Sequence, residues 1–296
     1  MFPKPNDGFA WVQDAGGLAL VCEPLAAPHF FTTRSWALGS TTEAEPAAAW
    51  EAVGRSVGVD QGHLCRAHQV HGASVSVRRI GDPTCGGQPL PDADIIVSDD
   101  PARALAIQTA DCVPLLVADR RTGAVAAAHA GWKGLAAGVP RATVLALARE
   151  FGSRPVDLVA AAGPSIGACC YEVAADVRDA FRRGGFADAV LQRWFLATPQ
   201  PTARNPSMPG LPDAPRAEHW FFDGWAATRH QLEEAGIPLH NIHFAGLCTA
   251  SHPRFLCSYR RDGSSAGRAA AAIRISDYRV FQNRGAGWLA LRKPQP

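Results

Sequence analysis

The chain has 296 residues, of which 47% are hydrophobic and 19% are charged. This composition is that of an ordinary globular protein with a thin coat of charge, and it excludes a chain that is disordered throughout. Lys and Arg together number 29 and Asp and Glu 27, so the formal net charge is +2. That balance excludes the broad basic surface of a nucleic-acid-binding protein, but it is compatible with a local pocket for a small anion.

The N-terminal sequence MFPKPNDGFAWVQ lacks the basic start and the apolar run of a secretory signal. Every apolar run is interrupted before it reaches the ~20 residues that a membrane helix needs. We therefore expect a cytoplasmic protein that does not bind a membrane. The eight cysteines are then expected to be reduced thiols, most of them core residues. No CxxC pair is present, which excludes a thioredoxin-like motif and a paired-cysteine zinc knuckle.

The predicted elements mix strands and helices along the whole chain. Strands are expected at 18–22, 29–33, 68–80, 95–99, 104–119, 123–132, 157–167 and 241–246, with a closing hairpin at 254–276. Helices are expected at 43–57, from about 141 to 151, at 171–185 and at 223–236. The segment 198–217 holds six prolines and is predicted to be a surface insertion. Because the elements do not follow a strict βαβ alternation, the pattern favours an α+β fold of layered mixed sheets, formed as one domain over residues 1–296.

A predicted hairpin brings two residues with metal-binding side chains near each other, Cys112 in TADCVP and His129 in AAHAGWKG. The strands 113–118 and 124–129 flank a short turn and are expected to pair. If Ala118 faces Ala124, Cys112 lies beside His129 but not on its face of the hairpin. A register shifted by one residue, or a bulge, places both side chains on the same face. The sequence leaves these two registers open.

A third candidate is a histidine of the segment HQVHG. Side chains alternate along a strand, so His68 and His71 point to opposite faces and only one of them can join the site. One thiolate and two imidazoles form a donor set that suits Zn²⁺, and three protein ligands leave the fourth position open, as in catalytic zinc sites. A metal of this kind makes hydroxide available at neutral pH. The alternative for a cysteine in a hydrophobic strand is simple packing in the core.

The motifs HQVHG, TADCVP, HAGWKG, GPSIGACCYEV and CSYRRDG occur in this order, and the chain resembles the YfiH-like laccase-domain family from about Phe30 to Ile275. The resemblance implies a cytoplasmic enzyme with a layered α/β sandwich fold. It also implies that His71, Cys112 and His129 are the metal ligands and the catalytic residues. Their metal is usually zinc, with Cu²⁺ as the alternative. The expected partners are a purine nucleoside (adenosine, inosine or S-methyl-5'-thioadenosine) and phosphate, and an adenosine deaminase side activity is expected.

Four further residues are candidates for substrate binding: Arg34, Asp94, Glu172 and Arg260. Arg34 and Arg260 could grip phosphate through a guanidinium fork. Asp94 enters a buried strand, where it could orient a ligand histidine, and Glu172 is expected at a helix start, where it could move protons. Each also has a purely structural interpretation. The chain departs from the family pattern at Lys133, where arginine is usual, and in the residues that follow the TTR motif, which puts the rim of the pocket in question.

Three other functions fit the same candidate site. The first is hydrolysis of an amide in a peptidoglycan precursor, with hydroxide or the Cys112 thiolate as nucleophile. The second is copper-dependent oxidation of phenols, although none of the ten histidines has the partner two residues away that multicopper oxidases use. The third is a binding module without catalysis. The H-x-E…P-C-x-x-C signature of zinc nucleobase deaminases is absent, so deamination would use a different scaffold.

Overall fold

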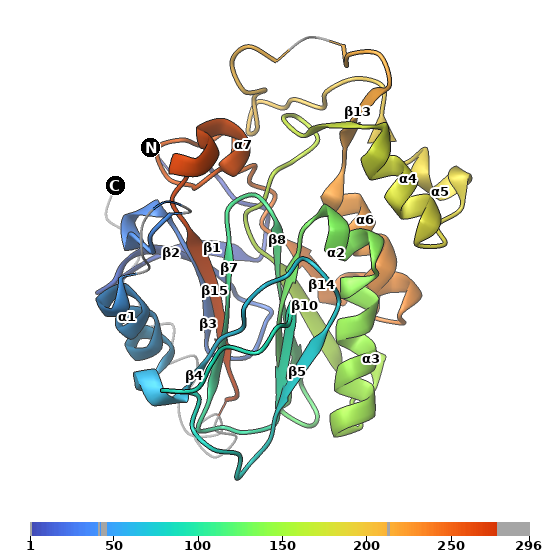
Figure 1. Cartoon of the computed structure of the whole chain (residues 1–296). Helices are drawn as coiled ribbons and strands as arrows, with labels where there is room; N and C mark the ends of the chain where they lie inside the picture. The colour runs from blue at the N-terminus through green and yellow to red at the C-terminus, as the bar shows by residue number, and fades with distance from the viewer. Residues whose placement is uncertain (1, 41, 43–45, 212–213, 277–296) are drawn as a thin grey trace.

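The computed structural model describes residues 2–40, 42, 46–211 and 214–276. Within these ranges the strands form two six-stranded sheets and one three-stranded sheet, and helices lie on the outside (Figure 1). The predicted α+β class with layered mixed sheets is confirmed.

The first large sheet contains both the start and the end of the described chain. Its strands, in spatial order, are β1 (Phe9–Asp14), β2 (Gly17–Cys22), β3 (His29–Thr32), β15 (Ala269–Arg274), β7 (Ala104–Thr109) and β4 (Leu64–Cys65). All neighbours are antiparallel except β4 and β7, which are parallel. The last strand is therefore inserted between strands from the first part of the chain.

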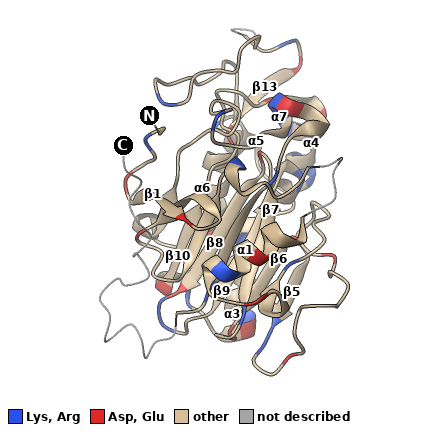
Figure 2. Ribbon diagram, turned by 90° about the vertical axis from the view of Figure 1, so that its left-hand side faces the viewer, with Lys and Arg blue, Asp and Glu red and all other residues tan. Residues whose placement is uncertain are grey.

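The second large sheet contains the predicted hairpin at its centre. Its strands, in spatial order, are β14 (Ile242–Phe244), β10 (Leu158–Ala162), β8 (Val113–Asp119), β9 (Val125–Ala130), β6 (Ile95–Ser98) and β5 (Val75–Arg78). The two edge pairs are parallel and the inner pairs are antiparallel. Among Asp, Glu, Lys and Arg, the strands β8, β9 and β10 carry only Asp119, as expected for strands buried on both faces (Figure 2).

The alternation of side chains along the strands explains why the two sheets pack face to face. In β2, Leu20 faces the apolar layer between the sheets, while Val21 faces a separate cluster on the outer side. In β8, Leu116 faces the layer between the sheets, and Leu115 faces a cluster with the helices on the opposite side. Because successive side chains of a strand point to opposite faces, each sheet can bury both of its faces.

Helices complete the outer layers. The helix α1 (Ala47–Val57) covers the first sheet, burying Trp50 and Val53 in its outer cluster. On the other side of the molecule lie α2 (Trp132–Ala136), α3 (Val139–Phe151) and α6 (Gly224–Glu234) (Figure 1). Two further helices, α4 (Ala175–Arg183) and α5 (Asp188–Leu191), accompany the small sheet β11 (Glu172–Ala174), β13 (His219–Phe222) and β12 (Phe195–Leu196). Among the helices of the described part of the chain, none has the length and apolar character to cross a bilayer.

Three predicted elements differ from the structure. The strand expected at 68–80 shrinks to β5, because the backbone at His71 has a positive φ of 62° that a regular strand does not adopt. The helix expected at 171–185 begins only at Ala175, since residues 172–174 pair with β13 instead. The expected closing hairpin is replaced by the short helix α7 (Tyr259–Asp262) and by β15, whose partners β3 and β7 are distant in sequence.

Other predicted boundaries hold. Gly138 separates α2 from α3, which begins at Val139, two residues before the expected start, with Pro140 in its first turn. The C-cap Gly152 has a left-handed backbone that ends α3 where expected. Helix 43–57 is present as α1 from Ala47, and its residues 43–45 lie outside the described residues. The described residues of the segment 198–217 form no helix or strand and make the long loop at the top of Figure 1.

The expectation that all cysteines are reduced is wrong for one pair. Cys65 at the end of β4 is joined by a disulfide to Cys85, which lies in the loop before β6. Arg103 lies beside this bond, and its guanidinium donates to the carbonyl oxygen of Pro83 at 2.9 Å. Sequence spacing did not reveal the pair, because 20 positions separate the two cysteines. The other six cysteines are free thiols.

Candidate metal centre and its cavity

The three predicted ligands meet at one end of the layer between the sheets. Ligand atoms of His71, Cys112 and His129 all lie within 4.8 Å of one another. His129 lies in β9, Cys112 directly precedes β8, and His71 lies in the loop between β4 and β5. Residues far apart in the sequence are thus brought together at one point.

The pairing of β8 with β9 puts Cys112 and His129 on one face. Pro114 is paired with His129, which is the register shifted by one residue from that in which Ala118 faces Ala124. Cys112 lies two positions before Pro114 and therefore points to the same side of the hairpin as His129. Of the two registers that the sequence left open, the structure has the one that allows a shared ion.

The loop that carries His71 is fixed by side chains rather than by strand pairing. The carboxylate of Asp94 accepts hydrogen bonds from the backbone N–H groups of His71 (3.0 Å) and Gly72 (2.6 Å). Two residues earlier, the amide of Gln69 bonds both the N–H and the carbonyl of Gln108, each at 2.7 Å. These bonds hold the left-handed backbone of His71, which is unusual for a residue with a side chain. The imidazole is consequently aimed at the other two ligands.

Asp94 also determines how His129 faces the site. Its Oδ1 lies 2.8 Å from Nδ1 of His129, and its side chain is fully buried. The carboxylate accepts the Nδ1 proton, so in the neutral form of the ring Nε2 carries the lone pair that can bind a metal. Burial would raise the pKa of Asp94, but the hydrogen bonds from His129 and from the Gly72 N–H lower it below its usual range. The carboxylate thus stays ionised and orients the His129 ring through its Nδ1.

The electrostatics of the trio favour a thiolate. Burial opposes ionisation of Cys112, but the charge of His129 and hydrogen bonds from both histidines lower the pKa of Cys112 to about 6. Burial likewise opposes the protonated form of His129, whereas the Cys112 thiolate and Asp94 raise the pKa of His129 to about 9. A thiolate is the form in which cysteine binds a metal.

The space between the ligands suits an ion. The rings of His71 and His129 are 4.8 Å apart between centroids and meet at 82°. Gly131 leaves room beside them, because a Cβ at this position would lie 2.8 Å from Cys112 Sγ and 3.2 Å from His71 Cδ2. One thiolate and two imidazoles are borderline-soft donors, so the residues present fit Zn²⁺, and they also fit copper.

A large cavity opens onto these ligands. Its volume is about 670 Å³, enough for a nucleoside-sized molecule. Its walls combine the three ligands with cationic and aromatic side chains: Arg66, Arg260, Arg268, Trp132, Tyr171 and Tyr259. The combination allows an anion and a flat ring to lie beside the metal centre.

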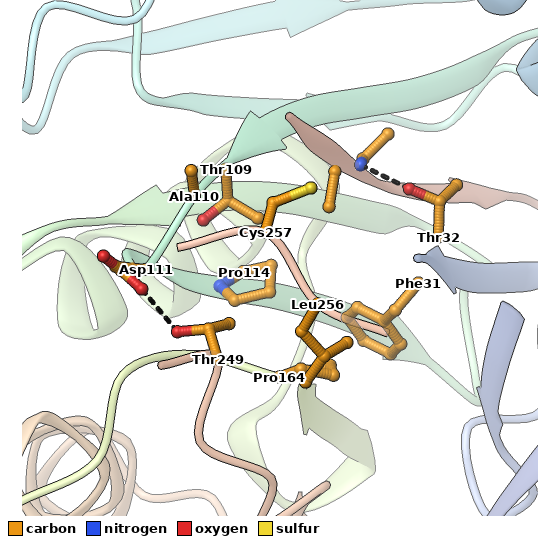
Figure 3. A pocket seen from close by; sticks show the side chains of 12 residues that line it. Phe31, Thr32, Thr109, Ala110, Asp111, Pro114, Pro164, Thr249, Leu256 and Cys257 are labelled. Atoms are coloured by element: carbon orange, nitrogen blue, oxygen red, sulfur yellow. Dashed lines mark hydrogen bonds between the residues drawn. The ribbon is translucent and has the colours of Figure 1, made fainter. Parts of the chain in front are cut away.

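Arg260 is the predicted substrate residue that lines this cavity. Its Nη1 donates to the backbone carbonyl of Glu172 at 2.7 Å, and its guanidinium lies 4.8 Å from the ring centre of Tyr171. Its backbone N–H donates to the carboxylate of Asp111 at 2.6 Å, and the Thr249 hydroxyl donates to the same carboxylate (Figure 3). Asp111 therefore fixes the start of α7 rather than joining the metal ligands.

The other predicted substrate residues lie elsewhere. The Glu172 carboxylate is nearly buried and accepts three hydrogen bonds from Arg216, the shortest at 2.8 Å. It lies in β11, not at a helix start. Arg34 lies outside the cavity lining, and its guanidinium donates to the carbonyl of Pro253. Asp94 touches His71 and His129 rather than the cavity.

Several cavity residues were missed by the sequence reasoning. Arg66 precedes HQVHG by a few residues, and His68 of that motif lines the cavity while bonded to Asp92 at 2.7 Å. Tyr171 and Tyr259 stand inside the motifs GPSIGACCYEV and CSYRRDG. In each of these two motifs a tyrosine stands next to a predicted substrate residue, Glu172 or Arg260, and this neighbourhood could have indicated that the tyrosine lines the site.

The comparisons with known proteins agree with this geometry. The sequence profile of the family described as multi-copper polyphenol oxidoreductase laccase matches residues 34–276. The chain belongs to this YfiH-like laccase-domain family. A relative in Bacteroides thetaiotaomicron named purine nucleoside phosphorylase is 36% identical over 186 residues, which are 63% of this chain and 62% of that protein. A purine nucleoside phosphorylase of Streptomyces coelicolor is 35% identical over 239 residues, 80% of this chain and 86% of that one.

Solved structures of the YfiH-like family share the fold. The crystal structure of the hypothetical protein YfiH from Bacillus licheniformis matches 90% of this chain and 99% of its own, with a TM-score of 0.76 and 27% identity. YlmD from Geobacillus stearothermophilus matches the same shares with a TM-score of 0.73 and 26% identity. The layered arrangement is therefore that of the family.

Proposed function

We propose that this chain is a zinc-dependent purine nucleoside phosphorylase acting on adenosine, inosine and S-methyl-5'-thioadenosine, with adenosine deamination as a side activity. The observation that carries the proposal is the cavity in which a Cys/His₂ donor set faces arginine and aromatic side chains. The names of the relatives support the same reaction class. In this reaction the bond between the sugar C1' and the purine nitrogen breaks, a bond to a phosphate oxygen forms, and the purine leaves with a proton.

Phosphate would be held by the guanidinium groups of Arg66, Arg260 and Arg268, which line one cavity. Guanidinium forks match the geometry of phosphate oxygens and keep their charge at any physiological pH. Arg260 is the best positioned of the three, because its bonds to Glu172 and Asp111 fix both its side chain and its backbone.

The purine would stack on the aromatic part of the lining, formed by Trp132, Tyr171 and Tyr259. Flat rings of this kind favour offset stacking with a heterocycle. His71, Cys112 and His129 would hold the zinc ion. When bound, the ion supplies Lewis-acid polarisation next to the reacting groups. Asp94 keeps the His71 loop and the His129 ring in place while the substrate binds.

The test is purine release from each nucleoside with and without phosphate, together with detection of the sugar 1-phosphate. We expect turnover that depends on phosphate, and a loss of at least 100-fold in the Cys112→Ala chain. The Arg34→Gln variant is the matched control, since this arginine lies outside the cavity lining and should retain full activity. Purine release that ignores phosphate would refute phosphorolysis.

A second candidate is an amidase acting on a peptidoglycan precursor. It is favoured by the alignment of Cys112, His129 and Asp94, which follows the pattern of a nucleophile, a base and an orienting carboxylate. In that reaction the Cys112 sulfur would displace the amine as an acyl-thioester forms, and water would release the acid. A muropeptide screen run beside the nucleoside assay separates the two, and phenol oxidation by the copper-loaded chain is the third arm of the same screen.

A further inference from the structure

A second group of sulfur atoms lies outside the His71–Cys112–His129 centre. The Sγ atoms of Cys169, Cys170 and Cys248 all lie within 4.8 Å of one another. Cys169 and Cys170 belong to the segment between β10 and β11, whereas Cys248 follows β14. None of the three side chains is more than 2% exposed. Packing in the core, the role expected for most cysteines of this chain, does not explain why these three thiols converge.

The backbone brings these two segments together independently of the sulfurs. Ser165 forms a parallel bridge with Cys248. Its N–H donates to the carbonyl of Leu247 at 3.3 Å, and its carbonyl accepts the N–H of Thr249 at 3.1 Å. The side-chain oxygen of Asn205 also accepts the N–H of Cys248 at 2.9 Å. The site is thus preorganised before any ligand is present, which reduces the cost of binding.

Backbone N–H groups donate to two of the three sulfurs, while the Cys170 thiol donates to the carbonyl of Pro206. The N–H of Gly167 donates to Cys248 Sγ at 3.3 Å, and the N–H of Met208 donates to Cys170 Sγ at 3.2 Å. Backbone N–H donors to sulfur are the partners that metal-bound thiolates commonly have.

The shell around the sulfurs is apolar and contains a thioether. Ile166 and Ala250 belong to the same buried cluster, and Met208, Leu211 and Trp225 pack against it. A shell of this kind excludes water from the sulfurs and leaves soft donors as the main ligands. Sulfur donors of this type select thiophilic metals over magnesium or calcium.

We propose that Cys169, Cys170 and Cys248 form a three-thiolate site for a thiophilic d¹⁰ ion, either Zn²⁺ or Cu⁺. Metal–sulfur bonds of about 2.3 Å place three sulfurs around one ion about 4 Å apart. The observed sulfurs need to move by less than about 1 Å to reach that geometry. Binding releases the thiol protons to solvent, and no oxidant or reductant is involved.

The Ser251 hydroxyl is placed to complete the site. Its Oγ lies 3.6 Å from both Cys169 Sγ and Cys170 Sγ, and it donates its proton to the carbonyl of Pro206 at 2.6 Å. Its lone pairs are therefore available on the side of the sulfurs, as a fourth ligand for Zn²⁺. A trigonal Cu⁺ ion would leave it unbound, so this serine discriminates between the two ions.

An ion at this position would connect the two walls that support the substrate cavity. Cys170 is followed by Tyr171 of the cavity lining, and Cys248 is followed by Thr249, which bonds the carboxylate of Asp111. The role is structural, because the three cysteines do not line the large cavity. The proposal does not depend on the reaction that the cavity performs.

The experiment measures metal stoichiometry in the full-length chain, reduced and stripped with a chelator, then dialysed against Zn²⁺ or Cu⁺. We expect two bound equivalents in the wild type and one in both Cys248→Ser and the double variant Cys169→Ser/Cys170→Ser. Cys257→Ser is the matched control, since this cysteine is buried but lies outside both clusters, and it should keep two. In the Cys112→Ala chain, which lacks the thiol of the other centre, displacement of the bound Zn²⁺ by Cu⁺ identifies Cu⁺ as the occupant, and retention identifies zinc.

The same measurement in a Cys112→Ala chain should leave one equivalent, which assigns the remaining ion to the three-cysteine site. A readout without any substitution is ¹¹³Cd NMR of the wild type, where we expect a second resonance shifted downfield as for a three-thiolate environment. A Cys112→Ala chain that binds no metal, or the absence of the three-thiolate resonance, overturns the proposal.

Discussion

Asp94 and His129 form the most constrained pair of the centre, with Oδ1 of the buried carboxylate 2.8 Å from Nδ1 of the imidazole. The same carboxylate accepts the N–H groups of His71 and Gly72. One side chain therefore determines the orientation of one metal ligand and the backbone position of another. It does so without touching the metal position itself.

The Asp94→Asn substitution tests this relationship. The amide nitrogen cannot accept a hydrogen bond, so at least one of the three donors loses its partner. We expect the affinity for Zn²⁺ to fall about 10–100-fold, the range seen when such supporting carboxylates are changed. Competition with a chromophoric chelator measures the affinity of each variant for Zn²⁺. The control Asp92→Asn changes an exposed carboxylate bonded to His68 and should leave the affinity unchanged.

A second prediction concerns the space that Gly131 leaves beside the candidate metal ligands. Its backbone, with φ −70° and ψ 173°, accepts alanine without strain, but the added Cβ would lie 2.8 Å from Cys112 Sγ. We expect Gly131→Ala to fold with a melting temperature close to that of the wild type and to lose at least 10-fold in Zn²⁺ affinity. Gly224→Ala is the control, because the nearest atom to its Cβ would be at an ordinary 3.5 Å. Equal affinity in both variants would contradict the steric argument.

Arg260 makes a prediction about phosphate. Removing a charged hydrogen-bond donor from an anion site costs about 1.5–3 kcal/mol, or about 10-fold to 100-fold in binding. We expect Arg260→Gln to raise the KM for phosphate by at least 10-fold while the KM for the nucleoside changes far less. Steady-state kinetics with each substrate varied in turn measures the split. A rise confined to the nucleoside KM would assign this arginine to the other substrate.

His29 predicts a loss of stability in acid that is unrelated to the metal centre. Its buried ring donates from Nδ1 to the carbonyl of Ala27 and accepts the N–H of Cys22 at Nε2, so it is neutral in the folded chain. Burial lowers the pKa of His29 from 6.5 to about 4, against a smaller opposing effect of the Ala27 carbonyl. The unfolded chain therefore binds the proton first as the pH falls below 6.5.

The contribution of His29 to the free energy of unfolding should accordingly be fully present above pH 6.5. It should decrease by about 3 kcal/mol as the pH falls towards 4. Denaturant titrations across that range measure the change. His29→Gln should be less stable at neutral pH but should show a shallower decline in acid than the wild type. The exposed His68→Gln serves as control and should keep the wild-type slope.

Much of the fold could be predicted from local patterns. The apolar runs in 104–119 and 123–132 predict strands, although residues 110–112 divide the first range into β7 and β8 of different sheets. The helix α3 ends at Gly152 as its sequence predicts. What could not be predicted depends on partners distant in the chain. Residues 172–174 form a strand only because β13 lies beside them, and the inserted β15 finds its neighbours more than 150 positions away.

The site divides in the same way. The donor chemistry of His71, Cys112 and His129 is visible in the sequence, but the hairpin register that unites two of them differs from its alternative by a single residue. Arg34 illustrates the opposite case, since its motif suggested an anion clamp and its guanidinium is directed to a backbone carbonyl. The convergence of Cys169, Cys170 and Cys248 depends on the β-bridge between Ser165 and Cys248, which no local sequence pattern predicts.

The three candidate metal ligands lie on or next to the sheet framework, whereas Arg66 and Tyr171 of the cavity lining lie in connecting segments and Arg260 lies in the short helix α7. Connecting segments accept replacements and insertions more readily than paired strands do. Substitutions in the cavity lining can therefore change the substrate while the framework of the candidate metal centre stays the same. This division agrees with a family whose profile is described as a laccase and whose relatives are named purine nucleoside phosphorylase.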